Sequence, residues 1–301
     1  MGGMQIRLSG YGAASVEPSP VNRMMAAFAW EFRDGLDINV GVGYVNEATI
    51  PSARLVEAMQ AVEADKRKYR QAFNYGGPSG AANLVESLKG FLARHDNGLD
   101  AETIRRSRLI IGPCEATSVL DSIAAVLPVG VVITSDPNYY IYTETLERKG
   151  FKVVAVAEDA EGPCLETLER KLAELGDDAR AISFFYFVTV NNPSCTVMSN
   201  ARRRALLDVA ARLSREQNRR IPVFYDLAYE LLLHDPEAEP FRSVLPEDEM
   251  GIAYEIGTLS KVLAPGLRMG YLMGPAGVMV DAMVQRTSDA GFSAPPFVQE
   301  M

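Results

Sequence analysis

The sequence predicts an α/β fold, a three-layer sandwich in which helices cover both faces of a mostly parallel, seven-stranded sheet. From about residue 40 onwards, short β-branched runs alternate with longer amphipathic stretches. The short runs are continuously apolar, which is typical of parallel strands buried on both faces. At 301 residues, with 48% hydrophobic and 23% charged residues, the chain can bury a large core and has an ordinary globular composition.

Each element follows from these patterns. An irregular arm with one short helix, 22–32, occupies the first 40 or so residues. Helical periodicity then predicts helices over 53–69, 81–94, 116–126, 139–149, 165–175, 201–217 and 278–287. The predicted strands are 108–112, 131–134, 152–156, 181–190, 221–226, 253–259 and 269–274. Because only a short loop separates the last two strands, we expect the final strand to run antiparallel.

Charge and composition disfavour several classes of function. A net charge of −9 argues against a nucleic-acid or anionic-membrane surface. The three cysteines, Cys114, Cys164 and Cys195, are too few and too widely spaced for a disulfide framework or a metal pair. With only His95 and His234 available, no metal site is expected. The sequence shows no signal-peptide pattern and no apolar run of membrane-spanning length, so we expect a cytoplasmic protein.

Chemically active side chains collect at the predicted strand ends. In an open parallel sheet, ligands bind beyond the carboxyl ends of the strands. The segments that follow the predicted strands contain acids, amides, tyrosines and a lysine. They are 112–115 (GPCE), 136–139 (DPNY), 191–193 (NNP), 226–229 (DLAY) and 258–261 (TLSK).

Lys261 and Asp226 form the central pair of these candidates. Lys261 is the only lysine from residue 172 onwards, a stretch that contains eleven arginines. A desolvated lysine amine forms Schiff bases with carbonyl compounds. Asp226 ends an apolar strand, where an uncompensated carboxylate is costly and a protonated pyridine nitrogen would compensate it. Taken alone, Lys261 would more often be a surface residue and Asp226 a helix cap, but together they indicate pyridoxal phosphate chemistry.

Four motifs carry a resemblance to a known family. They are DPNYY (136–140), NNPSC (191–195), YDLAYE (225–230) and SKVLAPGLRMGY (260–271). In this order they resemble the fold-type I pyridoxal-phosphate-dependent aminotransferases of class I/II, most closely the aromatic, aminoadipate and kynurenine-type subgroup. The resemblance runs from about residue 39 to the end. It implies the large-domain fold of these transferases, pyridoxal 5′-phosphate as cofactor, and amino-group transfer between an amino acid and a 2-oxo acid.

The resemblance also implies roles around the cofactor ring. Lys261 would hold the cofactor as an aldimine and move the substrate proton. Asp226 would bind the ring nitrogen, and Tyr229 and Asn192 the 3′-oxygen. Tyr139 would lie flat on the ring, although core packing is the alternative for this tyrosine.

The resemblance also implies a phosphate cup. Arg268 would contact the phosphate, although by itself it could instead pair with Asp226 or Glu230. The segment Gly112-Pro113-Cys114 is a weak match because Pro113 has no N–H to donate. The helix opening at Glu115 would complete the cup, and Glu115 itself is expected to serve the helix start. The other expected phosphate contacts are Thr258 and Ser260.

Two further segments predict a homodimer with shared active sites. NYGGPSG (74–80) resembles a motif in which the tyrosine, here Tyr75, reaches the phosphate of the neighbouring subunit. INVGVGYVN (38–46) resembles a segment that lies over the substrate, with Gly43 and Asn192 as the expected substrate contacts.

Departures from the family pattern qualify these expectations. Cys195 stands where the family usually has glycine, which asks for a different local turn; both Cys195 and Cys114 are expected to be small core residues. The run 202–204 (RRR) is expected to be a solvated helix face, or to contact a partner. GFSAPPFVQEM (291–301) resembles the approach to a small C-terminal domain that carries the substrate-carboxylate arginine.

We therefore expect a fragment or truncated product with three parts. They are an N-terminal arm (1–45), a pyridoxal-phosphate-binding large domain (46–287) and the start of a truncated small domain (288–301). Such a chain could bind cofactor with impaired catalysis. The amino-acid donor is not legible, although the LAPGLR form favours bulky, aromatic or long acidic side chains.

Two other functions stay open. The same site could serve a lyase, decarboxylase or oxidase. The fold could also be the ligand-sensing part of a transcription regulator. A basic helix-turn-helix module precedes the fold in such regulators, whereas an irregular arm and an acidic charge are found here, which disfavours this alternative.

Overall fold

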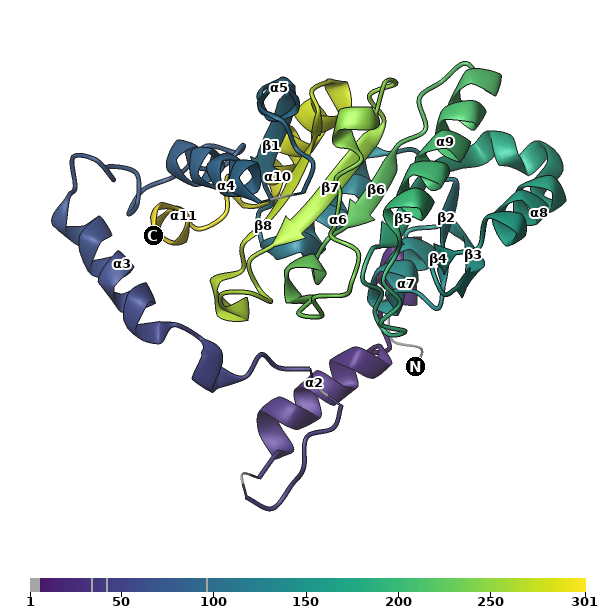
Figure 1. The fold of residues 1–301 in the computed structure, drawn as a ribbon. Coiled ribbons are helices and arrows are strands. Elements are labelled where there is room, and N and C mark those ends of the chain that lie inside the picture. The colour runs from purple at the N-terminus through teal and green to yellow at the C-terminus, as the bar shows by residue number, and fades with distance from the viewer. Residues whose placement is uncertain (1–5, 34, 42, 96) are drawn as a thin grey trace.

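The computed structural model of the chain describes residues 6–33, 35–41, 43–95 and 97–301. One sheet of eight strands, in the order β1-β8-β7-β6-β5-β2-β3-β4, forms its centre (Figure 1). The strands are β1 (Ser107–Ile111), β2 (Val131–Asp136), β3 (Lys152–Asp159), β4 (Gly162–Pro163), β5 (Ile182–Val188), β6 (Val223–Asp226), β7 (Ala253–Thr258) and β8 (Gly270–Pro275).

The sheet is mixed but mostly parallel. Strands β3, β2, β5, β6 and β7 pair in parallel. Strand β8 lies antiparallel between β7 and β1, which confirms the expected reversal of the last strand. The predicted number of seven strands is wrong. The additional strand is β4, whose two residues pair with the end of β3 and are too few to produce a periodic pattern.

All seven periodic helices of the sequence are present, with ends that differ by a few residues. Helix α8 has the predicted bounds, whereas α3 ends five residues earlier than predicted. Three short helices, α1, α5 and α11, were not predicted. The helices are α1 (Gly10–Ala14), α2 (Pro20–Glu31), α3 (Ser52–Ala64), α4 (Ala82–Arg94), α5 (Ala101–Arg106), α6 (Glu115–Val126), α7 (Tyr140–Arg148), α8 (Leu165–Leu175), α9 (Asn200–Glu216), α10 (Val278–Gly291) and α11 (Pro296–Glu300).

Two apolar layers pack on the two faces of the sheet. One contains side chains of α4, α8 and α9, and the other contains side chains of α6, α7 and α10. Neighbouring residues of β5 belong to different layers: Phe185 packs in the first and Phe184 in the second, and both are fully buried. This two-sided burial is the physical reason for the continuous apolar strands in the sequence.

The N-terminal arm lies apart from the sheet. In Figure 1, α2 and the segment leading to α3 extend away from the layered body. Large apolar side chains of the arm are exposed, with Trp30 at 89% and Val40 at 94%. Exposed apolar surface of this kind marks an interaction site.

Candidate active site

Asp226 is the buried acid at the centre of the site. It is the last residue of β6 and is 5% exposed. The Tyr186 hydroxyl donates a hydrogen bond of 2.8 Å to Asp226 Oδ2, and the Ala228 N–H donates one of 3.1 Å to Oδ1. Burial nevertheless raises the pKa of Asp226 to about 6, because the two donors only partly replace lost water. A cationic ligand group beside this carboxylate would therefore be strongly favoured.

Lys261 is the cation that is expected to act together with Asp226. It lies in the turn that follows β7 and is half-buried. Its Nζ is 5.4 Å from the centre of the Tyr229 ring. Its charge acts to lower the pKa of Asp226 against the larger effect of burial. Lys261 and Asp226 thus lie at the carboxyl ends of two neighbouring parallel strands, β7 and β6.

Two tyrosines and an amide follow the ends of strands at the same edge of the sheet: Tyr139 after β2, Asn192 after β5 and Tyr229 after β6. Asn192 Nδ2 donates a hydrogen bond of 3.3 Å to the Tyr229 hydroxyl. Tyr139 lies directly before α7. Burial, followed by the charges of Asp226 and Glu115, raises the pKa of Tyr139 to about 12. Tyr139 is thus near enough for the charge of Asp226 to contribute to its raised pKa.

The carboxylate of Glu115 binds the two side chains expected to hold phosphate. Thr258 Oγ1 donates to Glu115 Oε1 at 3.0 Å, and Arg268 Nη2 lies 3.1 Å from Oε2. The ion-pair partner of Arg268 is therefore Glu115, and not Asp226 or Glu230 as the sequence suggested. Glu115 is the first residue of α6, as expected. Its side chain, however, contacts Thr258 and Arg268, two residues of the expected phosphate cup.

The pKa of Glu115 is lowered despite its burial. Burial opposes ionisation, but the N–H of Thr117 and the charge of Arg268 outweigh it. Glu115 and Arg268 both have left-handed backbone conformations, with φ of 67° and 53°. This conformation is uncommon for residues other than glycine. Both partners of the ion pair therefore have an unusual backbone.

The other expected phosphate contacts lie around this pair. The buried Ser260 hydroxyl has no hydrogen-bond partner. Cys114 N–H donates to Ser118 Oγ at 2.7 Å, and Gly112 N–H donates to the carbonyl of Gly270 at 2.9 Å. Pro113 joins these two residues and has no N–H. The free hydroxyl of Ser260 is thus the clearest unfilled polar group of the cup.

A close backbone approach holds the start of α6 against β8. A Cβ atom on Gly270 would lie 2.2 Å from the nitrogen of Ala116. Only glycine allows the two segments to meet in this way. The approach fixes the position of Glu115 relative to Arg268, which precedes β8.

These residues fit pyridoxal 5′-phosphate. The buried Asp226 carboxylate with a raised pKa suits a cationic ring nitrogen. Lys261 offers the amine for an aldehyde, and the unpartnered Ser260 hydroxyl offers a donor for a phosphate oxygen.

Two predicted contacts lie apart from this group within one chain. Tyr75 is 77% exposed, with its ring 5.3 Å from that of Phe292. Gly43 belongs to the arm, and no heavy atom lies within 4 Å of the position of an added Cβ. Val42, in the same glycine segment, lies outside the described residues.

Two features of the site were missed in the sequence. Tyr186 is one of several aromatics in its strand, so only the pairing of β5 with β6 reveals it as the partner of Asp226. The role of the Glu115 side chain was also missed. In addition, Cys114 and Cys195 are exposed and not core residues. A different local turn was expected at Cys195, but its backbone is left-handed, at φ 61°, a conformation that glycine adopts readily.

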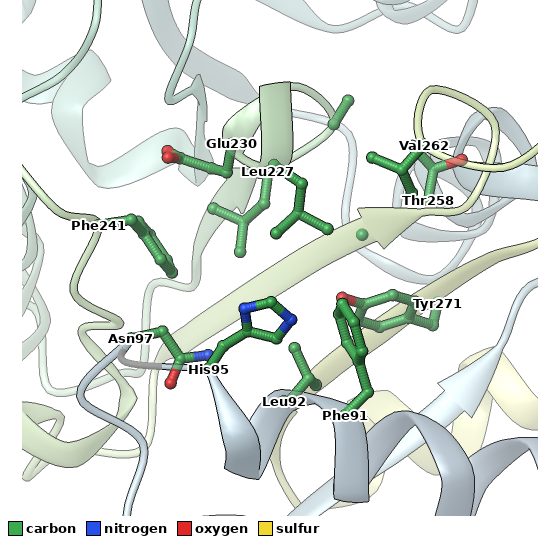
Figure 2. Close-up of a pocket in the computed structure, with 13 residues that line it drawn as sticks. Phe91, Leu92, His95, Asn97, Leu227, Glu230, Phe241, Thr258, Val262 and Tyr271 are labelled. Carbon is green, nitrogen blue, oxygen red and sulfur yellow. The ribbon is translucent and has the colours of Figure 1, made fainter. Parts of the chain in front are cut away.

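Two cavities adjoin these residues. One, of about 310 Å³, is lined by Asn192, Cys195, Tyr229 and leucines 232 and 233. The other, of about 140 Å³, lies on the α4 face of the sheet (Figure 2). There Phe91 of α4 and His95, which directly follows α4, point toward β7 and Leu227. The first cavity is the one that adjoins the Asn192–Tyr229 pair.

Other kinds of site were sought across the described residues. In the described part of the chain, no group of three or more His, Cys, Asp or Glu side chains is arranged to hold a metal ion. Within residues 6–33, 35–41, 43–95 and 97–301, no helix combines the length and apolar character needed to cross a membrane.

Comparison with known proteins finds one family whose profile matches most of the chain. The profile described as "Aminotransferase class I and II" matches residues 34–300. The uncharacterized HTH-type transcriptional regulator YdfD of Bacillus subtilis is 26% identical over 253 residues, which are 84% of this chain and 47% of YdfD. The aromatic-amino-acid aminotransferase 1 of Thermococcus litoralis is 29% identical over 206 residues, 67% of this chain and 46% of that enzyme. The chain spans about half the length of these curated relatives.

Solved structures show the same fold. An archaeal alanine:glyoxylate aminotransferase superposes with a TM-score of 0.84 at 26% identity, covering 97% of this chain and 69% of that one. Pyrococcus horikoshii kynurenine aminotransferase superposes with a TM-score of 0.78 at 23% identity, covering 96% and 67% of the two chains. At these identities the likeness is chiefly one of fold.

Proposed function

The chain belongs to the class I and II aminotransferase family, and we propose that it binds pyridoxal 5′-phosphate and transfers an amino group between an amino acid and a 2-oxo acid. The observation that carries the proposal is the position of Lys261, in the turn after β7, next to the strand β6 that ends in the buried Asp226. A carboxylate whose pKa burial raises to about 6 favours a cationic partner. A primary amine beside it supplies the nucleophile.

The cofactor, when bound, withdraws electrons from the α-carbon of an amino acid and so makes its proton acidic. Asp226 would keep a proton on the ring nitrogen. Lys261 would bind the aldehyde and, once released by the substrate amine, act as the base that takes the α-proton. Tyr229 and Asn192, already hydrogen-bonded to one another, would bind the 3′-oxygen. The neutral ring of Tyr139 would support the ring face.

The phosphate would occupy the cup between α6 and the turn after β7. Arg268 and Thr258 would donate to its oxygens, together with the free hydroxyl of Ser260. The backbone from Gly112 to Cys114 borders this cup. These assignments follow the family resemblance and the placement of the side chains.

We also propose that two copies of the chain form a homodimer with shared sites. The exposed arm and the exposed Tyr75, which lie apart from the site in one chain, support this arrangement. Tyr75 would reach the phosphate, and Gly43 the substrate, of the neighbouring copy. The division into an arm (1–45), a cofactor-binding domain (46–287) and the start of a small domain (288–301) stays a prediction.

Chemical trapping tests the central assignment. Borohydride reduction of the protein with pyridoxal 5′-phosphate should attach a pyridoxyl phosphate group to the peptide that contains Lys261, as detected by mass spectrometry. Lys261→Ala should remove the label. Lys152→Ala is the matched control, because Lys152 lies on the surface in a pair with Asp178 and should keep the label. A wild-type protein that traps no cofactor would contradict the proposal.

A ligand-sensing function is the second candidate, because the curated relatives include HTH-type regulators such as YdfD. A lyase, decarboxylase or oxidase on the same site is a third. An amino acid that converts bound cofactor stoichiometrically to its amine form supports transamination. Tight cofactor binding without any such conversion argues against transamination, and the sensor is then separated from the lyase, decarboxylase or oxidase by the absence of any product formed from the amino acid.

A further inference from the structure

We propose that the carboxylate of Glu115 is a built-in anion in the phosphate cup and that it weakens the binding of the cofactor's phosphate; this inference rests on the proposed function. Thr258 and Arg268, the two side chains that would hold the phosphate, both bind Glu115. Within α6 itself the Glu115 carboxylate bonds only to Thr117, so its contacts with Thr258 and Arg268 go beyond what the helix start uses.

The contacts of Glu115 are those that an anionic ligand would make. Its two oxygens take separate partners, Thr258 Oγ1 at 3.0 Å and Arg268 Nη2 at 3.1 Å. The Thr117 hydroxyl adds a third hydrogen bond of 3.0 Å. Glu115 is 8% and Thr258 7% exposed, so little water reaches the carboxylate and the hydroxyl, whereas the Arg268 side chain is 43% exposed and stays accessible to a ligand. A hydroxyl and a guanidinium that converge on a buried anion are also the donors that phosphate prefers.

A bound phosphate and the Glu115 carboxylate would compete for the same cation, Arg268. Glu115 stays ionised at neutral pH because its pKa is lowered. Arg268 is the one cation among the causes of that shift. A phosphate that enters the cup must therefore displace the carboxylate from Arg268 or share the guanidinium with it. Both routes place a like charge close to the phosphate, which disfavours binding.

The backbone holds the carboxylate in place. Glu115 and Arg268 have left-handed conformations, with φ of 67° and 53°. Gly270 meets the backbone of Ala116, so the α6 start cannot move toward β8. Ser260, by contrast, keeps an unpartnered buried hydroxyl. The cup thus retains one free donor, while its cation is already neutralised.

Glu115→Gln tests the inference, because glutamine has nearly the same shape but no charge, and its amide oxygen can accept from only one side of the present carboxylate, that of Thr258 or that of Arg268. Three probes are titrated: pyridoxal 5′-phosphate and pyridoxal by absorbance, and inorganic phosphate by thermal shift. We expect the variant to bind pyridoxal 5′-phosphate and inorganic phosphate about tenfold or more tightly, since removal of a nearby like charge is worth at least one factor of ten. The affinity for pyridoxal, which has no phosphate, should not change.

Glu166→Gln is the matched control. Glu166 also lies in the first turn of a helix, α8, and is exposed. This variant should bind all three probes like the wild type. Circular dichroism melting verifies that both variants are folded, and Glu115→Ala repeats the test if the glutamine variant is not.

The outcomes are decisive in both directions. Unchanged or weaker phosphate binding in the Glu115 variants overturns the inference and makes Glu115 a residue that orients Arg268 for the cofactor. The inorganic phosphate titration needs no covalent step. If borohydride traps no cofactor on the wild type but phosphate binding still rises in Glu115→Gln, the proposed function fails and the competition at the cup stands.

Discussion

The Tyr186 hydroxyl lies 2.8 Å from Asp226 Oδ2, and both side chains are buried on the same face of the sheet. Tyr186 and Asp226 come from the neighbouring parallel strands β5 and β6. One hydroxyl and one backbone N–H are few donors for a buried carboxylate. The free protein therefore maintains an acid whose ionised form is poorly compensated until a cationic group arrives.

Asp226 should make the stability of the cofactor-free protein fall as pH rises. Its pKa is raised from 3.8 to about 6 in the folded state. Between these values the folded protein binds more protons than the unfolded chain, so the free energy of unfolding decreases from about pH 4 to pH 6 and then levels off. Asp226→Asn should remove this contribution and stabilise the protein at pH 8 by about 2–3 kcal/mol.

Urea denaturation at pH 4 and pH 8 measures this difference. Comparison of the variant with the wild type isolates Asp226 from Glu255, whose pKa burial raises to about 7 with the same sign. The advantage of the variant should vanish at pH 4, and pyridoxal 5′-phosphate should stabilise the wild type more than the variant. A variant less stable than the wild type at pH 8 would show that the carboxylate is well compensated without cofactor.

The buried ion pair between Arg203 and Glu230 should be a major determinant of stability. Arg203 Nη2 lies 2.6 Å from Glu230 Oε1, and the two side chains are 3% and 5% exposed. The Arg203 guanidinium also lies 4.5 Å from the centre of the Phe241 ring. Arg203→Met leaves Glu230 and Glu255 buried without their cation. We expect a loss of about 3–5 kcal/mol in the free energy of unfolding.

Arg204 is the control for this prediction. It follows Arg203 in α9, but its side chain is 47% exposed, and its pairs with Asp208 and Glu247 lie at the surface. Arg204→Met should cost less than about 1 kcal/mol in the same denaturation experiment. Equal losses in the two variants would mean that helix propensity or net charge, and not the buried pair, sets the effect.

Much of the fold could be predicted because strands that are buried on both faces of a sheet are continuously apolar in the sequence. Helix α8 was predicted residue for residue, since its apolar positions repeat at helical spacing. Helix α5 was missed because its six residues, AETIRR, are largely polar. The strand β4 was missed because Gly162 and Pro163 have no strand propensity and pair only through the fold.

The site could be predicted as segments but not as contacts. The rule that strand ends converge brought the loops after β6 and β7 together, since these two strands pair in parallel. Which acid pairs with Arg268 depends on the close approach of α6 to β8, which no local pattern encodes. Arg203 was expected in a solvated face and is instead buried, because one position of the arginine run faces the sheet while Arg204 faces water.

Trp30 should report the association of two copies. It is the only tryptophan of the chain, and 89% of its surface is exposed in a single copy. If a second copy covers the arm, the emission of Trp30 should lie at short wavelength and resist iodide quenching at high protein concentration. Dilution should shift the emission to longer wavelength over the concentration range in which sedimentation velocity shows the dimer dissociating, because both signals then follow one equilibrium.

Two substitutions separate the proposed interface from other exposed surface. Tyr75 is 77% exposed and Val129, between α6 and β2, is 61% exposed. Tyr75→Ala should move the dissociation to higher concentration, since an aromatic anchor contributes strongly to a buried interface. Val129→Ser should leave it unchanged. A Trp30 that is fully quenched at every concentration, in a protein that sediments as a single copy, would mean that the arm stays open to solvent and that each site is built from one chain.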